Sequence, residues 1–126
     1  MSRTGEAGRR AERAARDYLV SQGYTIKEMN FRTRFGEVDI IAEKDDCLVF
    51  VEVRARRAGG LVGAAESITA RKLKRLVQAA LEYRAGHLEL SPQARFDFIG
   101  VELDGAGQPR RLEHIENALE VPPDLL

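Results

Sequence analysis

The sequence EVDIIAEKDDCLVFVEVR, residues 37–54, contains two runs rich in aliphatic and β-branched residues on either side of Lys44-Asp45-Asp46. Such runs, separated by turn-forming residues, are typical of a β-hairpin. If Asp45 and Asp46 form a two-residue turn, Lys44 pairs with Cys47 and the register of the whole hairpin follows. A three-residue loop would shift every pair.

The two-residue turn places two carboxylates, Asp39 and Glu52, directly opposite each other, with Glu37 opposite Arg54. These side chains share one face, because residues two apart in a strand point the same way. Opposed carboxylates repel, and a divalent cation such as Mg²⁺ would stabilise them. The same pattern also fits solvent-facing acids that pair with arginines such as Arg54 and Arg56. Spacing alone leaves both interpretations open.

Two helices are predicted on either side of the hairpin. Residues 7–22 have apolar residues at helical spacing and stop at Gly23, and Glu12 lies along the edge of the buried face. Thr69 can cap a second amphipathic helix that continues through Arg84.

Short β-rich segments account for most of the remaining chain. Strands are predicted at residues 24–29, 37–43, 47–54, 95–101 and near 112–115, with an extended loop or strand end at 30–35, a mobile loop at 55–67, a turn at Gln108-Pro109 and an irregular tail through Pro122-Pro123. The order is α-β-β-β-α-β-β, and the second helix permits a parallel crossover beside the antiparallel hairpin. We therefore expect an α/β fold with a mixed central sheet flanked by helices, in a single domain over residues 1–126.

The charge of this chain is zero overall but unevenly distributed. Residues 53–75 contain seven basic residues and one acid, whereas the residues after Val101 contain six acids and two arginines. Such a polarised chain can present one basic surface to a polyanion. A lone cysteine, the lack of a long apolar stretch and an arginine-rich N-terminus predict a cytoplasmic protein without a membrane span.

The stretches GEVDII at 36–41 and VFVEVRAR at 49–56 resemble the Asp…Glu-x-Lys signature of the restriction-endonuclease-like superfamily. More closely, and nearly end to end, the chain resembles the YraN-like family of bacterial proteins, whose pattern is similar to that of archaeal Holliday-junction resolvases. The matching positions are Glu12, Ala15, Leu19, Gly23, Tyr24, Asn30, Arg32, Gly36, Glu37, Asp39, residues 49–53, Arg56, Lys72, Arg95, Phe96, Asp97, His114, Ile115, Asn117 and Ala118.

This resemblance implies a restriction-endonuclease-like fold and a Mg²⁺-dependent endonuclease, with Mn²⁺ as a substitute metal. Asp39, Glu52 and the carbonyl of Val53 would bind the metal, and Glu12 would contribute directly or through water. The metal would orient a water and stabilise charge on the scissile phosphate. Nucleases of this type often form homodimers to cut two strands, so a homodimer is a further expectation.

Arg54 departs from the superfamily pattern, which has a lysine at this position. An arginine stays charged and cannot act as a base, although it can stabilise a phosphate in the transition state. Proton transfer would then fall to metal-bound water or to another group such as Lys72. Arg54 therefore completes the candidate catalytic set of Glu12, Asp39, Glu52 and Arg54.

Basic residues outside this set are candidates for nucleic-acid contact, with DNA favoured as the partner. They are Arg32, Arg34, Arg56, Arg71, Lys72, Lys74 and Arg75. The alternatives are a catalytically inactive nucleic-acid-binding module, or a protein-interaction subunit that uses the acidic C-terminal end. Outside these clusters, Arg95 and Asp97 predict an ion pair, and His114 is interpreted as structural.

Overall fold

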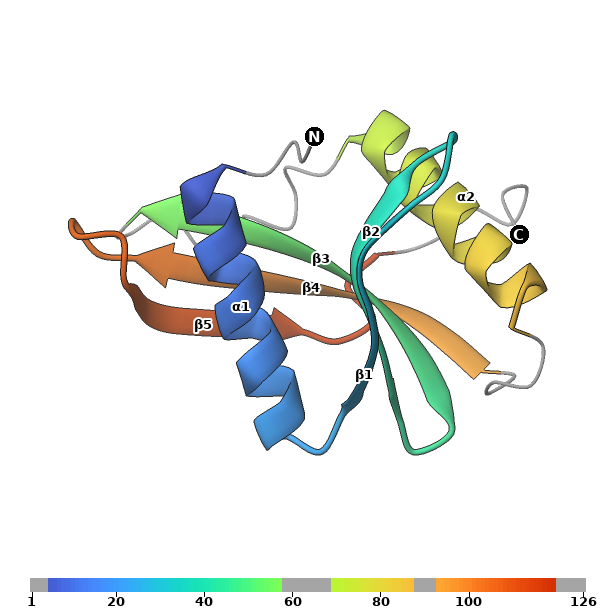
Figure 1. The fold of residues 1–126 in the computed structure, drawn as a ribbon, viewed down its shortest axis with the longest axis horizontal. Coiled ribbons are helices and arrows are strands. Elements are labelled where there is room, and N and C mark those ends of the chain that lie inside the picture. Colours follow the sequence, from blue (N-terminus) through green and yellow to red (C-terminus); the bar gives the residue numbers. More distant parts are fainter. Residues whose placement is uncertain (1–4, 58–68, 88–92, 120–126) are drawn as a thin grey trace.

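The computed structural model describes residues 5–57, 69–87 and 93–119 (Figure 1). Within these ranges the chain forms helices α1 (Glu6–Ser21) and α2 (Ala70–Ala85) and strands β1 (Thr25–Arg32), β2 (Glu37–Lys44), β3 (Cys47–Arg57), β4 (Gln93–Leu103) and β5 (Pro109–Ile115). The predicted α/β class and the order α-β-β-β-α-β-β are confirmed.

Both helices end or begin at the residues that the sequence indicated. After α1, Gly23 adopts a φ of +94°, a conformation that favours glycine and turns the chain into β1. At the start of α2, the Thr69 hydroxyl accepts the Lys72 N–H at 3.2 Å, which confirms the predicted cap. No helix within the described ranges is long and apolar enough to cross a membrane.

The strands form one sheet in the order β1-β2-β3-β4-β5. Strands β3 and β4 are parallel, and the other three neighbouring pairs are antiparallel. A parallel pair needs a crossover connection, which α2 supplies here. The expected crossover beside an antiparallel hairpin is therefore confirmed.

The sheet separates two apolar cores, because successive side chains of a strand point to opposite faces. Val51 of β3 packs in the core with Leu19 of α1, whereas its neighbour Phe50 packs in the core with Leu76 of α2. The two helices therefore cover opposite faces of the sheet. Figure 1 shows α1 crossing β3, β4 and β5, and α2 beside the end of the β1–β2 hairpin.

Several boundaries differ from the sequence expectation, and three of them differ by three residues. Strand β1 continues to Arg32, β3 continues through Ala55 to Arg57, and β5 already begins at Pro109. Strand β3 is longer because it stays paired with β4 as far as Arg57 and Leu103, and a distant partner strand cannot be inferred from a local pattern. The rest of the predicted mobile loop, residues 58–67, and the predicted tail around residues 122–123 lie outside the described residues.

Candidate functional site

The β2–β3 hairpin follows the predicted register only as far as Ile40 and Val51. Up to that pair the two-residue turn and its register are confirmed, but the pairs end there, so the expected backbone pairing of Asp39 with Glu52 is not formed. Instead, Asp39 Oδ2 accepts the N–H of Val53 at 2.8 Å. A side chain therefore satisfies the strand backbone where the neighbouring strand has moved away.

Strand β2 leaves β3 because the β1–β2 hairpin changes face at Asp39. Residues two apart in a regular strand share a face, yet Ile40 packs in the core with α1 and Val38 in the core with α2. The residues of β1 that pair with them make the same switch around Asn30, which has a φ of +54°. In the part of the chain that the structure describes, Asn30 Oδ1 is a buried oxygen without a hydrogen-bond partner.

Beyond the switch, the tip of the hairpin packs against α2. Glu37 pairs with Arg32 of β1, and their side chains form an ion pair at 2.8 Å, so the expected pairing of Glu37 with Arg54 is not formed. At the tip, a Cβ on Gly36 would overlap the carbonyl oxygen of Arg75 and lie 2.6 Å from its carbonyl carbon. Only glycine fits this approach, which fixes the tip against the first turns of α2.

The space between the diverging strands is a pocket of about 440 Å³, which we call the central pocket. Its lining consists of Gly8, Glu12, Glu37, Asp39, Glu52, Val53, Arg54, Ala55, Arg56, Lys72, Arg75 and Leu76. Side chains from α1 and α2 meet there although the two helices cover opposite faces of the sheet. The structure thus brings together Glu12, Asp39, Glu52, Val53 and Arg54, the whole candidate catalytic and metal-binding set.

Asp39 is a buried acid of the central pocket. Burial raises the pKa of Asp39 well above its ordinary value, and hydrogen bonding with Glu52 and the negative charge of Glu52 raise it further. The Val53 N–H lowers this pKa, whereas the charge of Glu12 adds a smaller upward shift. A proton or a cation between the carboxylates would relieve the repulsion.

Cationic side chains surround these acids in the same pocket. Arg54 Nη2 lies 3.7 Å from Glu52 Oε2. Lys72 is exposed to solvent, whereas Glu12 and Asp39 are buried. The pocket therefore combines buried negative charge with positive charge at its opening, which suits an anionic ligand that arrives with a cation.

The donor set of the central pocket fits Mg²⁺. Among the described residues, no three His, Cys, Asp or Glu side chains form a ready cluster for a metal ion, and Asp39 and Glu52 are a pair. Mg²⁺ typically binds one or two protein carboxylates and keeps water and phosphate oxygens as its other ligands. Zn²⁺ requires three or four protein ligands of the His, Cys or carboxylate type, which this pair does not provide.

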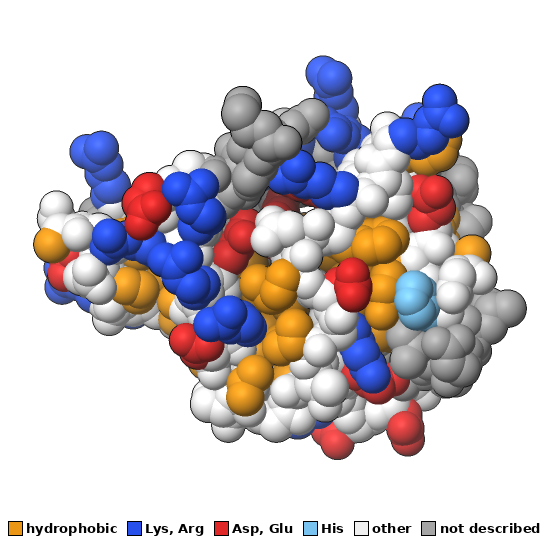
Figure 2. Space-filling model, viewed as in Figure 1, with side chains coloured by type: hydrophobic (Ala, Val, Ile, Leu, Met, Phe, Trp, Pro, Cys, Tyr) orange, Lys and Arg blue, Asp and Glu red, His pale blue; other side chains and the backbone are white. Residues whose placement is uncertain are grey.

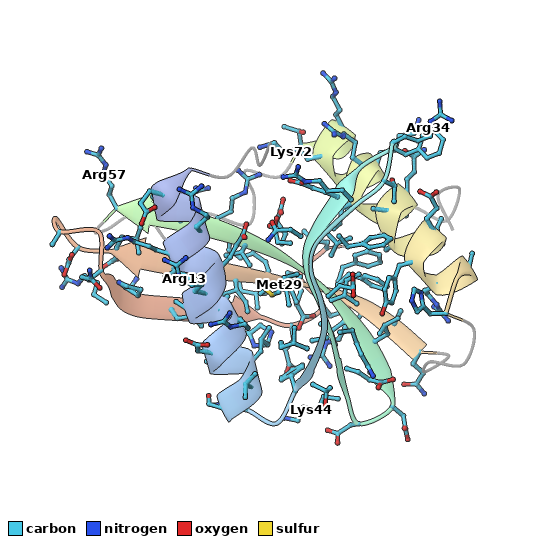
Figure 3. All side chains as sticks on the ribbon, in the orientation of Figure 1. Arg13, Met29, Arg34, Lys44, Arg57 and Lys72 are labelled. Carbon is cyan, nitrogen blue, oxygen red and sulfur yellow. The ribbon has the colours of Figure 1, made fainter. Side chains whose placement is uncertain are left out.

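Three of the basic residues predicted to contact nucleic acid line the central pocket, namely Arg56, Lys72 and Arg75. Arg71 and Lys74 lie on the same helix but are not part of the lining. In Figure 3, Lys72 lies at the start of α2, near the space between α1 and β2. Figure 2 shows lysine and arginine side chains gathered over α1 and along the upper edge of the molecule, with acids between them.

The two remaining candidates, Arg32 and Arg34, do not line the central pocket. Arg32 is held by Glu37, as described above, and Arg34 lies over the ring of Phe35 at 5.6 Å. Figure 3 places Arg34 at the far end of the hairpin, on the side of α2. The structure therefore separates these two arginines from the carboxylate pair.

Comparison with known proteins places these residues in a family. Residues 11–101 match the model of the family described as Uncharacterised protein family UPF0102, and this range contains the whole carboxylate pair and its arginine. The chain belongs to this family. The match supports the resemblance to the YraN-like family that the sequence indicated.

Individual UPF0102 proteins resemble the chain over most of their length. A UPF0102 protein of Nitrosomonas europaea is 43% identical over 120 residues, which cover 95% of this chain and 98% of the relative. One of Pelotomaculum thermopropionicum is 44% identical and covers 88% of this chain and 92% of its own length. One of Dichelobacter nodosus is 47% identical over 76% of each chain.

A second polar cluster of this UPF0102 chain has a structural role. Asp97 is fully buried; Arg95 donates to its Oδ1 at 3.0 Å, and His114 Nε2 lies 2.8 Å from its Oδ2. His114 Nδ1 lies 3.0 Å from the Tyr18 hydroxyl, which joins β5 to α1, and Arg95 also donates to the Tyr24 hydroxyl. The predicted Arg95–Asp97 ion pair is confirmed. His114 is held within this network, away from the residues that line the central pocket.

Some residues that shape the central pocket were not predicted from the sequence. Gly36 was part of the resemblance, but its close approach to α2 involves residues far apart in the chain. Glu37 and Leu76 line the central pocket although neither was a site candidate. Val38-Asp39-Ile40 alternates as a regular strand does, so the local pattern did not indicate that β2 changes face there.

Proposed function

We propose that this chain is a Mg²⁺-dependent phosphodiesterase of the restriction-endonuclease-like type that acts on DNA or branched nucleic acid. The observation that carries the proposal is the pair Asp39 and Glu52, two interacting acids of which Asp39 is buried, in a pocket with basic residues at its opening. Isolated buried acids are costly, and a divalent cation with a phosphate would satisfy both charges of this site.

Each residue of the candidate catalytic and metal-binding set has a role in this proposal. Asp39 and Glu52 would hold Mg²⁺ together with the Val53 carbonyl, and Glu12 would act directly or through water. When bound, the ion would supply a nucleophilic water and offset charge on the scissile phosphate. Arg54, next to Glu52, would stabilise the phosphate in the transition state.

A catalytically inactive nucleic-acid-binding module is the second candidate function. It is favoured by Arg54, because the superfamily has a lysine there and an arginine cannot accept the proton of the attacking water. In this case the basic residues would bind nucleic acid and the carboxylate pair would be a remnant of a metal site.

A cleavage and binding panel tests the proposal. Duplex, branched and single-stranded DNA and RNA are incubated with the wild-type protein in Mg²⁺, Mn²⁺ or EDTA, and binding is measured in parallel. Cleavage should require a divalent metal and should be lost in Asp39→Ala and Glu52→Ala, while binding persists. Glu113→Ala removes an exposed acid of β5 outside the pocket and should behave like wild type.

The outcomes separate the candidate functions. Metal-dependent cleavage that survives in Asp39→Ala would come from a contaminant or another site and would contradict the proposal. Binding without cleavage by any variant would support the inactive module. Absence of both would leave the interaction subunit as the remaining interpretation.

A further inference from the structure

A second pocket of about 640 Å³ lies next to the central pocket, and we call it the side pocket. Its described lining consists of Ala7, Ala55, Arg56, Arg57, Leu103, Asp104, Gly105 and Gly107. Ala55 and Arg56 line both pockets. Figure 3 shows Arg57 at the end of β3, on the far side of α1 from α2.

The wall of the side pocket formed by the β4–β5 turn is held in place by its own hydrogen bonds. Asp104 Oδ1 accepts the N–H groups of Ala106 and Gln108, both at 2.9 Å. Arg10 of α1 donates to the carbonyl of Gly107 at 3.2 Å, which attaches the turn to the helix. The wall is therefore preformed. Asp104, the one acid of the described lining, accepts hydrogen bonds from the backbone of its own turn.

The chemistry of the side pocket combines small apolar walls with positive charge. Ala7, Ala55, Leu103 and the two glycines present methyl groups and backbone, and Arg56 and Arg57 provide two guanidinium groups. Guanidinium groups bind phosphate well, and this volume is in the range of pockets that hold small molecules. A ligand that fits is small and carries an anionic group, and a nucleotide has both properties.

We propose that the side pocket binds the unpaired nucleotide that adjoins the cleaved phosphodiester, with Arg56 between the two sites. This inference rests on the proposed function and deepens it, because it names the substrate class. A base that is paired and stacked in a duplex cannot enter a pocket. The substrate is therefore a strand with an unpaired nucleotide beside the cleavage site, such as a flap or a single strand.

Filling the side pocket provides the test. Gly105 lines the side pocket and a Cβ there would meet no atom within 4 Å, so Gly105→Phe adds a ring at the pocket wall without a clash at the backbone. Ala106→Phe is the matched control, because Ala106 lies in the same turn, is exposed and is not part of the lining. Fluorescence anisotropy measures binding of a flap substrate and of a fully paired duplex of the same length in EDTA.

Gly105→Phe should weaken flap binding about tenfold and change duplex binding less than twofold. Arg57→Ala should likewise weaken binding of the flap more than binding of the duplex. Ala106→Phe should change the affinity for neither substrate. Equal losses on both substrates, or no loss on the flap, would overturn the inference while metal-dependent cleavage by wild type still supports the proposed function. If wild type binds no nucleic acid, both fall.

A measurement on the wild-type protein covers the case in which Gly105→Phe does not fold. Deoxyadenosine monophosphate is titrated into the protein and followed by amide NMR. The resonances of Gly105, Gly107 and Ala55 should shift, and those of Asn117 should not. Unchanged resonances at the side pocket up to millimolar nucleotide would overturn the inference without any variant.

Discussion

At the level of single residues, Asp39 and Glu52 are two acids that would each ionise separately in water. The raised pKa of Asp39 shows that the folded protein disfavours two full charges there. The Val53 N–H donates to Oδ2 of Asp39 and orients this carboxyl group, which also hydrogen-bonds with Glu52. The residue is therefore arranged to share a proton or a cation with its neighbour.

Asp39→Asn should stabilise the protein at neutral pH in EDTA, because it removes one of two repelling acids and can still accept the Val53 N–H. We expect a rise of a few degrees in Tm, which corresponds to about 1 kcal/mol. Mg²⁺ at millimolar concentration should raise the Tm of wild type, because it binds the folded state alone, but not that of Asp39→Asn. Differential scanning calorimetry measures both, with Glu113→Gln as the control. An equal effect of Mg²⁺ on all three proteins would contradict a site at Asp39.

Arg54→Lys should raise Mg²⁺-dependent cleavage by about tenfold or more if proton transfer limits the reaction, because an ammonium can lose its proton and a guanidinium cannot. The double variant Arg54→Lys/Glu52→Ala should be as inactive as Glu52→Ala. Single-turnover rates on one DNA substrate measure this. A slower Arg54→Lys would instead identify Arg54 as a phosphate-stabilising group in a site adapted to arginine.

At the level of elements, the site depends on how the β1–β2 hairpin meets α2. Gly36→Ala should destabilise the protein by about 1–3 kcal/mol, as overpacking does, because its Cβ would overlap the backbone of Arg75. Urea unfolding measures the loss. Gly105→Ala is the matched control, since a Cβ there meets nothing within 4 Å, and its stability should stay close to that of wild type.

The Asp97 cluster holds α1 against β4 and β5, and its energetics depend on pH. Burial alone would raise the pKa of Asp97, but hydrogen bonds from His114, Arg95 and Asn117 outweigh burial and lower it. A lowered folded-state pKa contributes stability above the unfolded pKa, and this stability is lost as the pH falls through the folded value.

Asp97→Asn should therefore cost about 3 kcal/mol at pH 7, the lower end for breaking a buried charge pair, and should flatten the loss of stability in acid. Urea unfolding at pH values from 7 down to 3 checks both effects. Glu116→Gln is the control, because its side chain is 63% exposed and its ion pair with Arg95 contributes little. A parallel pH profile for Asp97→Asn and wild type would contradict this role.

At the level of the whole molecule, positive charge lies on two helices that border the central pocket from opposite faces of the sheet (Figure 2). In the first two turns of α2, Lys72 and Arg75 line the pocket, whereas Arg71 and Lys74 do not. These two pairs carry equal charge at neighbouring positions of one helix. They allow contact with phosphate to be separated from the general field of the helix.

Lys72→Ala/Arg75→Ala should weaken DNA binding equally across sequences and reduce cleavage. It should also make the dependence of log affinity on log salt less steep, by the amount expected for the loss of about two phosphate contacts. Arg71→Ala/Lys74→Ala should leave cleavage and most of that slope unchanged. Alanine preserves the helix in both. Anisotropy titrations from low to high salt measure the slopes. Equal slopes for the two variants would show that Lys72 and Arg75 attract DNA only through their charge and do not contact its phosphates.

The sequence by itself determined the order of the elements and the cap of α2. It also indicated the two-residue turn and singled out Asp39 and Glu52 as a candidate pair, although a longer loop and a purely solvent-facing role for these acids remained open. These features depend on neighbours within a few residues: the alternation in 47–54, the hydroxyl of Thr69 before a helical pattern, the acids Asp45-Asp46 between two strands. The family resemblance added Glu12 and Arg54, whose place in the site no local pattern could give.

Only the tertiary structure decided how these residues meet. The local pattern extends the hairpin register to Asp39 and Glu52. In the structure, however, the segment of β2 before Ile40 turns away from β3, because the tip of the β1–β2 hairpin packs on α2, where Gly36 lies against the backbone of Arg75. That divergence creates the central pocket, and it depends on residues nearly forty positions apart. A register that period-two alternation sets locally is therefore overruled wherever a distant helix offers the strand a better packing surface.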